Sequence, residues 1–108
     1  MEIKNWDFNT FLAFLLIYAS HADLEFTESE KEQIQKIISP EKFEELYAIF
    51  NNMTDYQVLE LIISYKDTYF STAAEREQIF DEMKKLFAAD GDFSYLEKQL
   101  IMFLEKLL

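Results

Sequence analysis

The sequence contains no cysteine and only one glycine, one proline and one histidine. Without thiols the chain can form no disulfide and has no thiolate chemistry. One glycine and one proline are too few for the many tight turns of an all-β fold. One histidine and one glycine are also poor material for a nucleophilic triad or a phosphate-binding loop. An enzyme is therefore the least favoured class of function.

Basic residues are scarce as well. The chain has 10 lysines and arginines against 21 aspartates and glutamates, which gives a formal charge of −11. This charge repels nucleic-acid phosphates and anionic lipid headgroups, and it attracts cations and basic protein surfaces. Its simplest role is to keep an aromatic-rich chain soluble. We expect protein partners, whose identity the sequence does not give, and no nucleic-acid partner.

No hydrophobic run in this sequence has the length of a membrane span. The run "FLAFLLIYA" at residues 11–19 is far shorter than the roughly 20 apolar residues that cross a bilayer. The segment before it carries Lys4 against Glu2 and Asp7, whereas a secretory signal needs a net positive charge there. We therefore expect a helix buried on most sides, no membrane insertion and a cytoplasmic location.

Helix-capping residues divide the chain into segments whose apolar residues recur every three or four positions. No segment alternates with a period of two. The sequence predicts one all-α domain over residues 1–108, a compact bundle of about six helices. The fourth helix, "VLELIISY" and its flanks up to about Tyr69, is apolar on more than one face, so we expect it to lie centrally. The predicted helix starts are Asp7 or Asn9, Thr27 with Glu30, Ser39 before Pro40, Thr54 with Gln57, Ser71 or Thr72 with Glu75, and Ser94 with Glu97.

Two segments of the chain repeat each other. Residues 22–31, "ADLEFTESEK", and residues 89–98, "ADGDFSYLEK", are identical at five of ten positions. Each segment joins two predicted helices, so the chain contains two pseudo-repeated helix-loop-helix units. We expect the two acidic loops to lie near each other, and Phe26 and Phe93 to dock into a shared core.

The repeated segments carry carboxylates at matching positions. The second copy fits the later part of an EF-hand calcium loop, but the first and third ligand positions of such a loop would be Leu86 and Ala88. A full EF-hand is therefore excluded. A truncated carboxylate set remains in each copy, and it predicts an oxygen site for calcium or magnesium. The candidate metal ligands are Asp90, Glu97, Asp92, Asp23, Glu30 and Glu25.

Helix capping is the competing explanation for these carboxylates. Glu30 and Glu97 stand at the capping-box position, where they would only accept hydrogen bonds from backbone N–H groups. Capping explains Asp23 and Asp90 poorly, because an acid after a helix C-terminus meets the negative end of the helix dipole. His21 could ligate a metal beside Asp23, but a lone histidine at a helix end more often caps the last carbonyls, which is the interpretation we favour.

The segments "FLLIYASHADLEFTESEKEQI" and "LFAADGDFSYLEKQLI" resemble the tellurite-resistance TerB-like family, whereas residues 38–75 add little to the likeness. The family is all-helical, occurs in bacteria and is linked with tellurite or general stress resistance. Its members carry a helix followed by an Ala-Asp-Gly turn and a later glutamate, twice. The resemblance implies divalent-metal ligands at Asp23 and Glu30 and at Asp90 and Glu97, with Glu25 and Asp92 as weaker candidates. Leu24 departs from the family glycine, which puts the first loop in doubt.

Two functions follow from these observations. The first is a TerB-like stress-response module that binds a divalent cation through its acidic loops. The alternative is an acidic helical protein–protein interaction domain without metal, in which the carboxylates serve only as helix caps.

Overall fold

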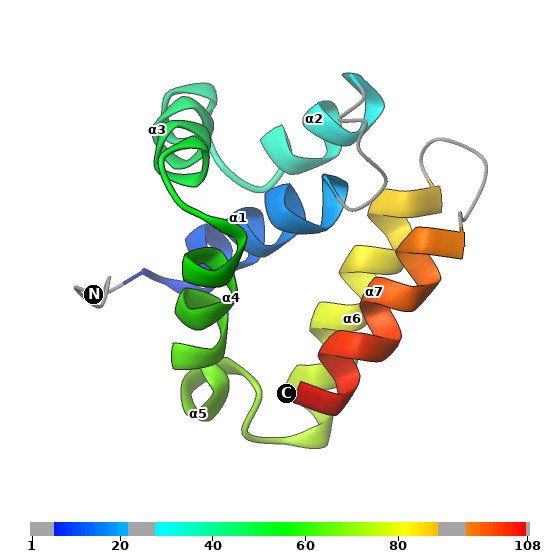
Figure 1. Ribbon diagram of the computed structural model, residues 1–108. Helices are drawn as coiled ribbons and strands as arrows, with labels where there is room; N and C mark the ends of the chain where they lie inside the picture. The colour runs from blue at the N-terminus through cyan, green and yellow to red at the C-terminus, as the bar shows by residue number, and fades with distance from the viewer. Residues whose placement is uncertain (1–5, 22–27, 89–94, 108) are drawn as a thin grey trace.

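The computed structural model describes residues 6–21, 28–88 and 95–107 of the chain (Figure 1). These residues form seven helices and no strand, which confirms the all-α prediction. No described helix is long and apolar enough to cross a membrane. The helices are α1 (Phe8–Ser20), α2 (Glu28–Gln35), α3 (Pro40–Asn51), α4 (Asp55–Ser64), α5 (Lys66–Tyr69), α6 (Ala73–Ala88) and α7 (Tyr95–Leu107).

Two of the predicted single-residue caps are present. Asp7 accepts a hydrogen bond from the backbone N–H of Thr10 at 2.8 Å, and this bond fixes the start of α1. The Ser39 side chain accepts from the N–H of Lys42 at 3.2 Å, and Pro40 follows as the first residue of α3. Each cap satisfies an N–H group that the helix itself leaves unbonded.

The two predicted capping boxes in the described part of the chain are also present. At α4, Thr54 accepts from Gln57 N–H at 3.1 Å, and the Gln57 side chain accepts from Thr54 N–H at 2.9 Å. At α6, Thr72 and Glu75 exchange the same pair of bonds at 3.1 and 3.2 Å. Local sequence alone therefore determines where these helices begin. The predicted caps Thr27 and Ser94 lie outside the described residues.

The predicted fourth helix is broken, so seven helices stand where about six were expected. α4 ends at Ser64, and α5 begins at Lys66. The Ser64 hydroxyl donates to the carbonyl of Leu61 at 2.5 Å, the group that a continuing helix would bond to Tyr65 N–H. The N–H of Tyr65 turns instead to the carbonyl of Ile62, at 3.1 Å.

α1 lies at the centre of the molecule and is buried on most sides, and its apolar run predicted this burial. Ten of its thirteen residues are buried, and it contacts α2, α3 and α6. The expectation that the fourth helix lies centrally is wrong: α4 buries only Val58, Leu61 and Ile62. Figure 1 shows α4 and α5 along one side of the bundle and α6 and α7 along another. An amphipathic helix needs neighbouring helices along one apolar stripe only. α1 is covered by neighbours on more of its sides than α4 is.

Two tyrosines at the break hold the segment that precedes α1. The Tyr65 hydroxyl accepts a hydrogen bond from the backbone N–H of Trp6 at 3.0 Å. The Tyr69 hydroxyl donates to the Trp6 carbonyl at 2.8 Å. Phe11 of α1 packs against both rings, with ring centres 4.7 and 5.3 Å away. The break after α4 is therefore tied to a segment about 60 residues earlier in the chain.

The two predicted helix-loop-helix units pack together. α1 contacts α2, α6 contacts α7, and α6 also contacts both α1 and α2. Figure 1 shows that α1 and α6 end on the same side of the molecule, where α7 begins. The expected proximity of the two loops themselves, and the docking of Phe26 and Phe93, fall outside the described residues.

Candidate functional site

One predicted metal ligand has a described side chain. Glu30 lies in the first turn of α2 and is 1% exposed. A carboxylate buried to this degree is unusual, because removal from water disfavours its charge. Glu97 lies in the first turn of α7, but its side chain is not described. The other four candidates lie outside the described residues: Asp23, Glu25, Asp90 and Asp92.

Where side chains are described, no three acidic or histidine residues come together as a group that could hold a metal ion. The side chains of five of the six candidate ligands lie outside the described part of the structure. The metal prediction for the acidic loops therefore stays a prediction.

His21 caps the last turn of α1, as the favoured interpretation predicted. Its Nδ1 atom lies 2.7 Å from the carbonyl oxygen of Ile17. A carbonyl only accepts hydrogen bonds, so Nδ1 carries the proton. Nε2 then accepts from the Tyr47 hydroxyl, 3.3 Å away on α3. Both ring nitrogens are engaged within the fold, which disfavours His21 as a metal ligand.

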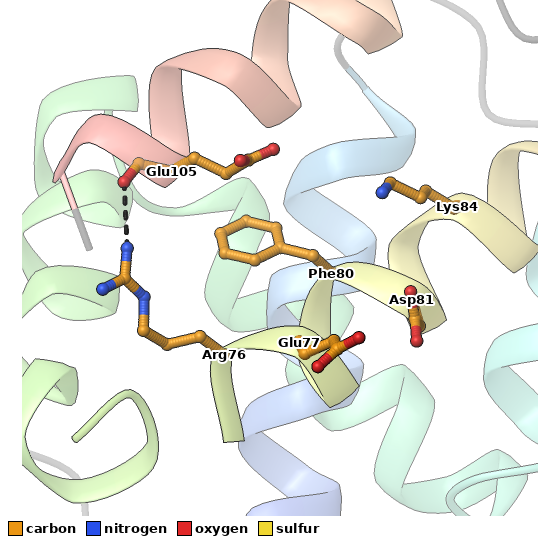
Figure 2. Close-up of a pocket in the computed structure, with 6 residues that line it drawn as sticks. All are labelled: Arg76, Glu77, Phe80, Asp81, Lys84 and Glu105. Atoms are coloured by element: carbon orange, nitrogen blue, oxygen red, sulfur yellow. Dashed lines mark hydrogen bonds between the residues drawn. The ribbon is translucent and has the colours of Figure 1, made fainter. Parts of the chain in front are cut away.

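A hollow lies between α6 and α7. This cavity of about 280 Å³ is lined by Arg76, Glu77, Phe80, Asp81, Lys84 and Glu105 (Figure 2). The Phe80 ring faces the space between the helices, and Arg76 reaches across to donate to the backbone carbonyl of Glu105 at 3.2 Å. Arg76 therefore caps the C-terminal end of α7, where a cation is favoured by the helix dipole.

The chemistry of this cavity is that of a charged surface rather than of a catalytic centre. Its lining has three carboxylates and two cations, and no hydroxyl, thiol or imidazole. A second hollow of about 250 Å³ lies between α2 and α3, where Lys31 sits over the Phe43 ring at 5.6 Å. That arrangement stabilises packing between the two helices through a cation–π contact.

One exposed apolar surface, on α4, was not predicted from the sequence. Tyr56 is 72% exposed and Ile63 is 36% exposed, although both are large and apolar. Two residues of α7, Met102 and Phe103, are exposed by 53% and 46%. The signal in the sequence was an apolar series at positions 56, 59 and 63, which runs beside the buried series at 58, 61, 62 and 65. The prediction of a central position for this helix did not identify an exposed side.

Comparison with known proteins finds no family model, curated protein or solved structure that matches the chain. The TerB-like resemblance therefore rests on the repeated motif residues alone.

Proposed function

We propose that this chain is an acidic helical domain that binds a positively charged protein partner in the cytoplasm and carries out no catalytic step. One observation carries the proposal. Four large apolar side chains remain exposed on α4 and α7 of a chain whose formal charge is −11. Exposed apolar groups release free energy when a partner covers them, and the surrounding charge selects a basic partner.

The charged lining of the α6–α7 cavity supports the same function. A small-molecule site is usually a concave, mostly apolar pocket with a few converging polar groups. The α6–α7 cavity has the opposite character, with five charged side chains around one phenylalanine. The exposed apolar side chains of this acidic protein therefore support binding to a protein better than the α6–α7 cavity supports binding of a small molecule.

A titration with three labelled helical peptides tests this function. The first is built from leucine and lysine, the second from leucine and glutamate, and the third from glutamine and lysine. We expect the leucine–lysine peptide alone to bind with a dissociation constant below about 1 mM, and its affinity to fall as salt increases. Equal binding of the acidic peptide, or no binding by any of the three, contradicts the proposal.

The second candidate is a TerB-like stress-response module that holds calcium or magnesium in its acidic loops. The observation that favours it is the burial of Glu30, at the position where the repeated motif places a carboxylate ligand. A divalent cation would neutralise that buried charge. A capping role for Glu30 accounts for the same burial, so the two functions need a direct test.

Thermal melts after chelation separate the two candidates. A cation that binds only the folded state raises the melting temperature. For the metal function we expect about 10 mM calcium or magnesium to raise it, and Asp90→Asn to reduce that gain. Asp90→Asn should also stabilise the metal-free protein by relieving repulsion. An unchanged melting temperature in the wild type contradicts the metal function and leaves the interaction function standing.

A further inference from the structure

Tyr56, Leu59 and Ile63 form a continuous stripe on α4, here called the α4 stripe. Each residue of a helix advances the direction of its side chain by about 100°, so positions 56, 59 and 63 point within about 60° of one another. Tyr56 is the most exposed of the three, and Leu59 is half-buried where it packs against the core. Along one side of α4 the stripe therefore runs from exposed Tyr56 past half-buried Leu59 to exposed Ile63.

The helix beneath the stripe is firmly held. Val58, Leu61 and Ile62 on its other side are buried in the core. The capping box of Thr54 and Gln57 fixes its first turn. A stripe on an anchored helix needs little ordering when a partner binds, so less of the binding free energy is lost.

Two carboxylates flank the α4 stripe, one on each side. By the same rotation of about 100° per residue, Asp55 lies on one flank and Glu60 on the other. Both are exposed. Residues 51–70 hold one further acid, Asp67, against a single base, Lys66. The segment that carries the stripe is therefore negative, and its complement is a partner segment with positive charges on both sides of an apolar series.

The exposed residues of α7 lack this arrangement. Met102 and Phe103 are neighbours in sequence and point about 100° apart, so they do not form one stripe. The exposed charged residues around them include Lys98 and Lys106 as well as Glu105, so the local charge is mixed. The α4 stripe is thus the better candidate surface.

We propose, on the basis of the interaction function above, that the α4 stripe docks a basic amphipathic helix. Tyr56 and Ile63 are two turns apart, about 10 Å along the helix axis. The partner would present apolar residues with the same two-turn spacing, flanked on each side by lysine or arginine. A second copy of this chain fits poorly, because the Asp55 and Glu60 carboxylates of the two copies would face each other.

The leucine–lysine peptide and three variants of the full chain test the site. We expect Tyr56→Ala combined with Ile63→Ser to weaken binding by about tenfold or more, as loss of central apolar anchors does. Glu60→Lys should weaken binding by about threefold or more and reduce its salt dependence. The control is Met102→Ala combined with Phe103→Ala, which changes two other exposed apolar residues and should alter affinity by less than about twofold.

The outcomes distinguish failure of the site on α4 from failure of the interaction function. Circular dichroism first shows that every variant keeps its helices, as expected for exposed positions. If the α4 variants bind normally and the α7 control loses binding, the site on α4 is wrong and the interaction function stands. If no variant and no wild-type protein binds the peptide, both proposals fall. If sedimentation shows wild-type self-association that the α4 variants abolish, the occupant is a second copy rather than a basic helix.

Discussion

α1 and α4 are both apolar helices, yet they end in different surroundings. α1 buries ten of thirteen residues, whereas α4 buries three of ten. α1 packs most closely against α2, α3 and α6, and α4 leaves the side that carries Tyr56 and Ile63 exposed. The difference shows that apolar composition predicts a packed helix but does not predict how many of its sides are covered. The apolar residues that a helix leaves exposed are the ones available to a partner.

The largest effect should come from the centre of α1. Phe14 is fully buried, with its ring centre 4.8 Å from that of Trp6 and 6.2 Å from that of Phe50. We expect Phe14→Ala to lower the free energy of unfolding by about 3–5 kcal/mol. The matched change in α4, Tyr56→Ala, should cost less than about 0.5 kcal/mol because the ring is largely in solvent. Urea denaturation measures the free energy of unfolding of both variants. Similar losses in the two would contradict the difference in burial between α1 and α4.

A smaller effect is expected where α4 begins. Thr54→Ala removes one half of the capping box and leaves the Gln57 N–H without its acceptor. We expect a loss of about 1 kcal/mol in the free energy of unfolding. Thr54→Ser keeps the hydroxyl and is the control, which should retain most of the stability. A loss equal in the two variants would mean that the threonine methyl, and not the cap, matters.

The hydrogen bond between Tyr69 and the backbone of Trp6 should contribute a similar amount to the free energy of unfolding at neutral pH. Tyr69→Phe removes the hydroxyl that donates to the Trp6 carbonyl, and we expect it to cost about 1 kcal/mol. Tryptophan fluorescence during urea denaturation reports the loss at the affected residue.

The same variant has a predicted pH dependence. Burial, chiefly, raises the pKa of Tyr69, with smaller contributions from Tyr65 and Asp7. A group whose pKa is higher in the folded state stabilises the fold below its unfolded value, near 10, and this contribution is lost as pH rises through the folded value. The gap in stability between wild type and Tyr69→Phe should therefore shrink above about pH 10. A constant gap up to pH 11 would contradict this account of the Tyr69 hydroxyl.

The smallest effect concerns the exposed cap of α1. Hydrogen bonds from Thr10, first from its side chain and then from its backbone, lower the pKa of Asp7. A lowered pKa stabilises the fold above the unfolded value, near 4, and this contribution disappears as pH falls through the folded value. Asp7→Asn should therefore be less stable than wild type at pH 7 and equal to it near pH 2. Melting temperatures of both proteins between pH 7 and pH 2 test this expectation. A difference in melting temperature that persists at pH 2 would contradict it.

Much of the fold followed from local sequence. The starts of α1, α3, α4 and α6 were predicted because each cap joins residues only three positions apart. The buried centre of α1 was predicted from its unbroken apolar run. His21 was predicted as a cap because its side chain reaches a carbonyl four residues earlier in the same helix.

The candidate surface was not predicted, for a physical reason. Positions 56, 59 and 63 are as apolar as their buried neighbours on α4, so sequence alone does not distinguish the covered side from the open one. The six candidate metal ligands came from the repeated motif, and only Glu30 has a described side chain, which is buried. Burial of that carboxylate was not evident from the motif, because it depends on the helices that surround α2.

The sequence by itself determined the all-α class, the starts of α1, α3, α4 and α6 and the apolar centre, because hydrogen bonds and side-chain spacing within one turn decide them. Only the tertiary structure decided that α4 lies at the edge, that Tyr65 and Tyr69 bind the backbone of Trp6, and that Tyr47 meets His21 across 26 residues. These contacts join segments distant in sequence. Their formation depends on which helix faces cover one another, a property of the assembled bundle and of no single segment.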